Sequence, residues 1–360
     1  MLSRKERVKL VREQVENGWH DKLWSCMVVY EDRICWDLLS SNPNISMDII
    51  KENPDKPWDW QYLSTNPNLT MEFINANPDK PWDWYWISSN PNITIKAIID
   101  NPDKPWDWYW ISSNPNITIK AIIDNPDKPW NWLCISRNPN ITMEDIKANL
   151  DKPWDWYNVS RNPNLTVEFM NGNLDKNWSW INISGNPNIK PSYFIENPNK
   201  QWDWHEISAN PNITIEFITE NPDKPWNWHH ISGNPNITLK YILDNPDNPW
   251  DWYYISINSN ITMKDILENP DKPWDWDGIS SNPNITMKDI LENPDKPWDW
   301  DGISRNPFTR DKAEYQLQHY RRHLASYRTQ QHWHRIRLDP RHPVCQRRLD
   351  REYDREFGSK

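Results

Sequence analysis

The sequence is poor in glycine, cysteine and continuous apolar segments. Only 7 of its 360 residues are glycine, which leaves no glycine-rich phosphate loop and no glycine turn of a calcium-binding loop. The four cysteines have no disulfide-framework spacing and are predicted to be free thiols of a reducing compartment; they are Cys26, Cys35, Cys134 and Cys345. No segment approaches the ~20 apolar residues of a membrane span, and the N-terminus lacks the apolar core of a signal peptide. We therefore expect an intracellular, cytoplasmic protein that is neither secreted nor inserted in a membrane.

Catalytic constellations are missing as well. The repeated region contains no Ser/His/Asp set and no isolated carboxylate pair. His319, His323, His332 and His334 have only Cys345 nearby, and a closed zinc site needs further ligands. The sequence therefore predicts a protein that is not an enzyme, with no catalytic residue, no metal site and no cofactor.

Tryptophan and proline are abundant instead, at 28 and 32 residues. The first tryptophan of a recurring unit falls every 24 residues, at positions 58, 82, 106, 130, 154, 178, 202, 226, 250, 274 and 298. The unit reads W-D-W-x-x-I-S-x-N-P-N-I-T-I/M-x-x-I-I/L-x-N-P-D-K-P, and a degenerate copy begins at Ile34. Residues 77–100 and 101–124 are identical, which indicates recent growth by duplication. A fixed period of this length is typical of a solenoid.

Each unit contains two short segments with helical signals. In one, Thr94 is a good N-cap and precedes Ile95, Ile98 and Ile99, spaced as one apolar helix face. In the other, Asp83 suits the positive end of a helix dipole, and Asn-Pro pairs end both segments. Helices below ~12–15 residues are unstable alone, so stacking on neighbouring units must stabilise them.

We predict an all-α fold, an α-solenoid of about eleven to twelve two-helix repeats with a Trp/Ile core and a helical C-terminal tail. A leucine-rich-repeat-like α/β solenoid is the alternative, because its period of 20–29 residues includes 24 and its asparagine also recurs. That template places an apolar residue two positions after the asparagine, whereas Ile93 follows Asn90 by three.

The chain divides into three segments: an N-terminal helical cap (1–33), the repeat array (34–307) and a basic helical tail (308–360). Their charge balances of +1, −17 and +6 make up the net charge of −10. Both ends depart from the repeat, as the capping units of a solenoid do. Contact with a polyanion is expected only in the tail.

Positions four, five and eight of the unit vary most, while the scaffold positions recur. Solenoids commonly present such positions along an extended surface, so we expect a protein partner to bind there; relaxed solvent exposure explains the variation equally well. The candidate residues are Tyr85, Trp86, Tyr109, Trp110, Arg137, Arg161, His205, Glu206, His229, His230, Tyr253 and Tyr254.

Two recurring features have both structural and functional interpretations. Asn-x-Thr/Ser recurs from Asn44 to Asn284 with an exception at Asn188; we expect the threonines to cap helices, because glycosylation needs a secretory route. The paired tryptophans resemble platforms that stack on bases, but a residue recurring at a fixed helical position is expected to pack in the core.

The tail is rich in Arg, His, Gln and Tyr. Leu317, Tyr320, Leu324 and Tyr327 are spaced by three and four residues, which predicts a helix to about Ile336. Candidates for contact with nucleic-acid phosphates are Arg321, Arg322, Arg328, Arg335, Arg337, Arg347 and Arg348. Acidic residues interleaved with these arginines weaken the nucleic-acid interpretation, and a helical hairpin that is packed or bound to a partner explains the tail equally well.

The array, with its W-D-W…N-P-N-I-T…N-P-D-K-P-W units, resembles tandem-repeat proteins of giant DNA viruses that infect amoebae. Residues 325–333, Ala-Ser-Tyr-Arg-Thr-Gln-Gln-His-Trp, followed by Arg-Leu-Asp-Arg-Glu-Tyr at 348–353, resemble a C-terminal tail common in such viral proteins. That tail usually has Ile-Gln before the Trp and Arg after it. Thr329 and His334 stand there instead, so no calmodulin-binding role is carried over. The resemblance implies a viral gene product, in the host cytoplasm or the virion, and no particular activity.

Together these observations predict a non-enzymatic repeat scaffold that binds a host or viral protein. A structural or bridging component of the virion is one alternative. Nucleic-acid binding through the basic tail is the other.

Overall fold

The computed structural model describes residues 4–325, and every regular element in that range is a helix. The predicted all-α solenoid is therefore confirmed. A leucine-rich-repeat-like fold needs a strand in each repeat, and the described range contains none, so that alternative is not supported.

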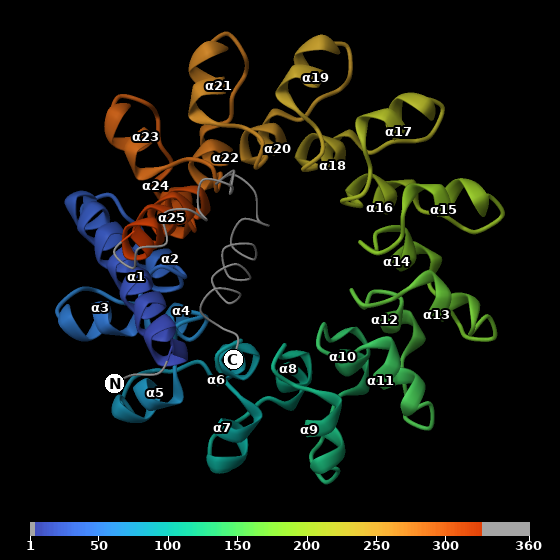
Figure 1. The fold of residues 1–360 in the computed structure, drawn as a ribbon, viewed down its shortest axis with the longest axis horizontal. Helices are drawn as coiled ribbons and strands as arrows, with labels where there is room; N and C mark the ends of the chain where they lie inside the picture. Colours follow the sequence, from blue (N-terminus) through green and yellow to red (C-terminus); the bar gives the residue numbers. More distant parts are fainter. Residues whose placement is uncertain (1–3, 326–360) are drawn as a thin grey trace. The chain divides into compact units, whose positions relative to one another are not determined.

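Two kinds of short helix alternate along the array (Figure 1). The even-numbered helices begin at the second Trp position of each repeat: α2 (Trp36–Ser40), α4 (Trp60–Leu63), α6 (Trp84–Ser89), α8 (Trp108–Ser113), α10 (Trp132–Arg137), α12 (Trp156–Val159), α14 (Trp180–Ser184), α16 (Trp204–Ala209), α18 (Trp228–Gly233), α20 (Trp252–Ile257), α22 (Trp276–Ser281) and α24 (Trp300–Arg305). The odd-numbered helices follow the recurring threonine position: α3 (Met47–Glu52), α5 (Met71–Ala76), α7 (Ile95–Asp100), α9 (Ile119–Asp124), α11 (Met143–Ala148), α13 (Val167–Asn171), α15 (Pro191–Glu196), α17 (Ile215–Glu220), α19 (Leu239–Asp244), α21 (Met263–Glu268) and α23 (Met287–Glu292). Before the array lie α1 (Arg4–Met27) and the 3-10 turn η1 (Val28–Tyr30), and after it lies α25 (Thr309–Ala325).

Side chains close both ends of each odd-numbered helix. In α7, the Oγ1 of Thr94 accepts the N–H of Ala97 (3.2 Å), which is the predicted N-cap. At the other end, Nδ2 of Asn101 donates to the carbonyl of Ala97 (2.8 Å). Ile98 is buried, but Ile99 is exposed. The predicted apolar face is therefore wrong at its last residue, because a helix of six residues buries only a narrow strip.

The aspartate at position two begins the even-numbered helices. Oδ1 of Asp83 accepts the N–H groups of Tyr85 and Trp86 (3.0 and 3.3 Å). Asn131 and Ser179 replace the aspartate and accept a bond of the same kind. The recurring acid is therefore explained as a helix cap that amide and hydroxyl groups can also supply.

A buried asparagine at position nine joins neighbouring repeats. Nδ2 of Asn90 donates to the carbonyls of Ser64 (3.1 Å) and Asn66 (2.8 Å) in the preceding repeat, and Oδ1 accepts the N–H of Asn92 (3.0 Å). The same pair of inter-repeat bonds recurs at Asn114, Asn138, Asn162, Asn186, Asn210 and Asn258. Asn90 is only 2% exposed, so these bonds satisfy polar groups that water does not reach.

The tryptophans form the seam between repeats. Trp84 meets Trp106 of the next repeat edge to face, with 5.0 Å between ring centroids. Nε1–H of Trp106 donates to the carbonyl of Asn101 (2.8 Å), and Nζ of Lys104 lies 5.4 Å from the Trp84 ring centroid. The tryptophans were predicted to pack in the core, and they do pack, but in the seam between repeats. Most of them are only half-buried, however; the buried tryptophans of the array are Trp58, Trp154 and Trp298.

The chain forms two compact units. The array unit is Trp58–Asn260, and the end unit combines residues 4–57 with 261–325. In the array unit, successive even-numbered helices pack against one another. α8 contacts α6 and α10, α10 also contacts α12, and α14, α16, α18 and α20 each contact the next in this order. They follow one side of this unit while the odd-numbered helices follow the other (Figure 1). The even-numbered helices therefore present one continuous layer.

In the end unit the first repeat stacks on the last. Nδ2 of Asn42 donates to the carbonyls of Ser304 (2.7 Å) and Asn306 (3.0 Å), and the N–H of Cys35 donates to Oγ of Ser304 (2.8 Å). Consecutive repeats use these same bonds elsewhere. α2 lies beside α24, and α1 packs along α25 (Figure 1). Residues more than 260 positions apart are thus neighbours in this unit.

Phe308 turns the chain from the array into α25. It stands where the preceding repeat has Asn284, with φ of 44° and a fully buried ring. Strain of ~1–3 kcal/mol for such a backbone is comparable to the ~1.5–3 kcal/mol gained by burying an aromatic side chain. In the first turn of α25, Asp311 accepts the N–H of Met287 at the start of α23 (3.1 Å). One helix therefore precedes the array in the sequence and another follows it; the part of the predicted tail helix beyond Ala325 lies outside the described residues.

Candidate functional site

Positions four, five and eight of the repeat come together on the even-numbered helices. Nε of Arg161, at position eight, donates to Oδ1 of Asn182 at position five of the next repeat (2.8 Å). Gly185 lies so close to Glu206 that an added Cβ would sit 2.9 Å from its carboxylate. We call these positions of the array unit the variable row. All twelve candidates chosen from the sequence lie on it.

Position four is the most exposed part of the variable row. Its side chains are apolar on five successive even-numbered helices, from α6 to α14. The exposed fractions run from 42% to 53% for Tyr85, Tyr109, Leu133, Tyr157 and Ile181. Contiguous exposed apolar side chains often mark interaction sites. The sequence-based choice omitted the last three of these residues, although their place at position four identifies them.

Four aromatic residues form a cluster at the α6–α8 end of the row. The Tyr85 ring lies 4.8 Å from that of Trp110 and 5.1 Å from that of Trp86. Tyr109 lies 5.3 Å from Trp110, and its hydroxyl is 3.5 Å from Nη2 of Arg137 on α10. These contacts hold flat, rigid rings side by side at the surface. Rings of this kind give large contact area at low entropic cost.

A second cluster lies on α16, α18 and α20. The rings of His205 and His230 are 4.3 Å apart, and Nδ1 of His230 is 3.0 Å from the carbonyl of His205. His229 lies 6.1 Å from Tyr254, which in turn contacts Tyr253 at 5.4 Å. The row is therefore aromatic toward both of its ends and carries histidines toward the α16–α20 end, where Glu206 is the acidic candidate.

The end unit has a different character at the same repeat positions. On α2, α22 and α24, position four holds the exposed carboxylates of Asp37, Asp277 and Asp301. Position five holds the buried glycines Gly278 and Gly302 on the last two. Position four is thus acidic on these three helices, whereas it is apolar from α6 to α14 of the array unit.

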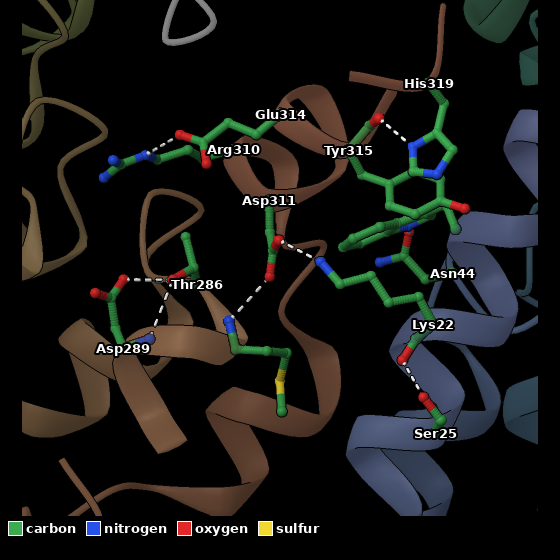
Figure 2. Close-up of polar contacts among 12 residues, drawn as sticks. Lys22, Ser25, Asn44, Thr286, Asp289, Arg310, Asp311, Glu314, Tyr315 and His319 are labelled. Carbon is green, nitrogen blue, oxygen red and sulfur yellow. Dashed lines mark hydrogen bonds and ion pairs between the residues drawn. The ribbon is translucent and has the colours of Figure 1, made fainter. Parts of the chain in front are cut away.

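A polar pocket of about 660 Å³ lies in the end unit between α1, α23 and α25 (Figure 2). Two pairs of oppositely charged side chains line it. Lys22 donates to Asp311 (3.0 Å), and Nε of Arg310 donates to Glu314 (3.0 Å). Figure 2 also shows Asp289 accepting from Thr286 at the start of α23. We interpret this cluster as the junction that joins three helices.

Burial and ion pairing act in opposite directions on Glu16 of α1, which faces α25. Burial raises the pKa of its carboxyl, but His20 and Lys312 together outweigh burial and lower that pKa to about 2. Nε2 of His20 lies 3.4 Å from Oε1, and Nε2 of Gln316 donates to Oε2 (2.9 Å). The carboxylate is therefore held ionised where the two flanking helices meet.

The tail candidates fall partly outside the described residues. Arg321 and Arg322 belong to α25, whereas Arg328, Arg335, Arg337, Arg347 and Arg348 lie beyond the described range. The ring of His319 stacks on Tyr315 at 3.9 Å, and its Nδ1 is 2.8 Å from the Tyr315 carbonyl. Among the described residues, no group of three or more His, Cys, Asp or Glu side chains is arranged to hold a metal ion.

The remaining sequence motifs have structural explanations. Nδ2 of Asn236, within an Asn-x-Thr motif, donates to the carbonyls of Pro211 (2.7 Å) and Ile213 (3.0 Å) in the preceding repeat. A glycan on this nitrogen would displace those bonds. Cys26, Cys35 and Cys134 are free thiols, and Cys345 lies outside the described residues. In the range 4–325, no helix is both long and apolar enough to span a bilayer.

The fold and the variable row define the class: an α-solenoid repeat protein whose scaffold positions pack and cap the repeats while its variable positions share one surface. Comparison of the chain with protein-family models, curated proteins and solved structures gave no match.

Proposed function

We propose that the protein is a non-enzymatic scaffold that binds a protein partner through the variable row. The observation that carries this proposal is the run of exposed apolar side chains at position four of α6 to α14. The scaffold residues around them are engaged in caps and inter-repeat bonds, so the exposed side chains at position four are free to vary without loss of the fold. Tyrosine, tryptophan and arginine, which recur along it, are the residues enriched in binding hot spots.

Substituting the row tests this proposal. The triple variant Tyr85→Ser, Tyr109→Ser, Tyr157→Ser removes three exposed rings from position four. A matched control, Ile99→Ser with Ile123→Ser, removes similarly exposed apolar groups from the odd-numbered helices. All three proteins are expected to unfold at nearly the same urea concentration, because no buried group is changed.

Affinity capture with quantitative mass spectrometry is the measurement, followed by titration of the purified partner. We expect the partner recovered by the wild type to be reduced at least about tenfold with the row variant, which corresponds to about 1.4 kcal/mol, and retained by the control. Equal recovery by the row variant, or no protein recovered above the bead background, contradicts the proposal.

We further propose, from the resemblance of the array and tail sequences, that the chain is a viral gene product acting in the host cytoplasm. Infected amoebae are accordingly the source for the capture experiment. Stoichiometric amounts in purified particles would instead favour a structural role in the virion.

A further inference from the structure

The charge along the variable row differs from that of the rest of the array. From α6 to α14, positions four, five and eight contain no aspartate or glutamate. The same positions contain two arginines, Arg137 at the end of α10 and Arg161 in the turn that follows α12. The N-caps of α10 and α14 are the uncharged Asn131 and Ser179, whereas α6, α8 and α12 are capped by Asp83, Asp107 and Asp155, whose carboxylates accept backbone N–H groups of their helices. The side chains at positions four, five and eight therefore form a strip that carries apolar and cationic but no acidic groups, within a chain whose net charge is −10.

Both arginines are held against the strip by their neighbours. Nη2 of Arg137 lies 3.5 Å from the Tyr109 hydroxyl, and its side chain is half-buried. The guanidinium of Arg161 lies 5.4 Å from the Tyr157 ring centroid, and its Nε donates to Asn182. These contacts use only part of each guanidinium, which has several donors suited to a carboxylate. Because the side chains are already positioned, less entropy is lost when a ligand binds.

The spacing of the strip suits an extended peptide. Packed helices lie roughly 8–10 Å apart, so successive position-four and position-eight side chains recur at about that interval. A polyproline II peptide rises ~3.1 Å per residue with three residues per turn, so every third side chain returns to one face after ~9 Å. Such a peptide can place a carboxylate near each arginine and an apolar side chain near each of Leu133, Tyr157 and Ile181.

We propose that the strip on the even-numbered helices α6 to α14 binds an acidic, extended peptide segment of the partner. Carboxylates repeat every third residue of this peptide, with apolar side chains between them. This assignment rests on the proposed function and names the chemistry of the partner. At physiological ionic strength, charges beyond about 8 Å are largely screened. The aspartates nearest the strip are already engaged as helix caps, so the arginines, rather than the acidic net charge, set the preference there.

Fluorescence anisotropy of the full chain with synthetic probes tests the assignment. The probes are fluorescein-labelled peptides of five Glu-Pro-Leu repeats and five Lys-Pro-Leu repeats, and a 15-nucleotide oligothymidylate. We expect the glutamate peptide to bind at least about tenfold more tightly than either of the others at 0.15 M salt. Equal or tighter binding of the lysine peptide overturns the proposal, and preferential binding of oligothymidylate assigns the strip to nucleic acid instead.

Variants locate the binding. The double variant Arg137→Glu, Arg161→Glu should lower the affinity for the glutamate peptide at least about tenfold. The double variant Arg137→Gln, Arg161→Gln adds no repulsion and should lower this affinity less. Arg305→Glu is the matched control, since Arg305 occupies position eight of α24 in the end unit, on the same helix as the exposed Asp301; it should leave the affinity unchanged. An affinity unaffected by both double variants overturns the assignment. The triple tyrosine-to-serine variant then distinguishes the two proposals. If it still fails to capture the protein partner although both arginine variants bind the peptide normally, the proposed scaffold function stands and the acidic-peptide assignment does not.

Discussion

The asparagine at position nine shows how a single side chain holds one repeat on another. Nδ2 of Asn138 donates to the carbonyls of Ser112 (3.0 Å) and Asn114 (2.9 Å), while its Oδ1 accepts the N–H of Asn140 (2.9 Å). Only a primary amide of this length supplies two donors and an acceptor in that geometry. An aspartate would lose the donors and place a charge where only 1% of the residue is exposed.

Replacing Asn138 by alanine is therefore expected to lower the free energy of unfolding by about 2–4 kcal/mol, because it leaves buried backbone groups without partners. Urea unfolding followed by tryptophan fluorescence measures the change. Asn140→Ala is the control: Asn140 is exposed, so a loss below about 0.5 kcal/mol is expected. Equal losses for the two variants would show that the inter-repeat bonds contribute little.

Glu16 gives a residue-scale prediction for pH. Its folded-state pKa of about 2 is below the ordinary value of 4.5. The ionised carboxylate is therefore stabilised by folding, fully above about pH 4.5, and this contribution is lost as the pH falls toward 2. The side chain is 36% exposed, so solvent screening reduces the effect to about 1 kcal/mol.

Glu16→Gln should accordingly lower stability at pH 7 by about that amount and flatten the pH dependence of unfolding between pH 4.5 and 2. Urea unfolding across this range is the measurement. Glu13→Gln on the same helix is the control, since Glu13 is more exposed and lies 3.7 Å from Lys9. If both variants keep the slope of the wild type, the contacts of Glu16 do not determine the pH dependence.

At the scale of the element, α15 lacks a feature that the other odd-numbered helices share. Its N-cap is Lys190, which makes no side-chain cap bond, whereas Ser or Thr caps the other ten. The backbone of Lys190 (φ −83°, ψ 153°) is nevertheless close to that of Thr94 (φ −91°, ψ 159°). A threonine there can therefore cap α15 without moving the chain.

Lys190→Thr is expected to stabilise the protein by about 1 kcal/mol through the restored cap. Lys190→Ala separates the cap from the loss of the lysine charge and should change stability by less than about 0.5 kcal/mol. Thermal and urea unfolding of the three proteins give the comparison. No gain for threonine over alanine contradicts the prediction.

Local signals predicted the elements well, because caps and helix ends depend on residues a few positions apart. Thr94 and the Asn-Pro pairs were sufficient to place α7. Long-range placement was less predictable. The exposure of Ile99 depends on which strip of a short helix meets its neighbours, and the donors of Asn138 act only once the repeats have stacked. Variation between repeats located the variable row, and the repeat register also places Leu133 and Ile181 at position four; that both are about half exposed is known only from the structure.

At the scale of the whole molecule, the end unit departs from simple solenoid behaviour, in which each repeat contacts only its sequence neighbours. Asn42 and Cys35 of the first repeat bond to Ser304 and Asn306 of the last, and α1 packs on α25. Nε1–H of Trp19 also donates to Oδ1 of Asn44, whose Nδ2 donates to the carbonyl of Pro307 (2.7 and 2.9 Å). The first and last helices therefore depend on each other for burial, although nearly the whole array separates them in sequence.

A chain ending at Asn260 tests this dependence. It lacks α24 and α25, so α1 and α2 lose the partners against which they pack. The helices from α8 to α18 keep both neighbours. We expect hydrogen exchange at α1 and α2 to accelerate at least about tenfold, since local protection follows the buried contacts of each segment, while exchange at α10 and α12 stays near that of the full chain. A chain ending at Ala325 serves as the control for loss of residues 326–360. Protection of α2 that survives truncation at Asn260 would show that the first repeat is stable without the last, and the bonds of Asn42 would then be a consequence of stacking rather than its cause.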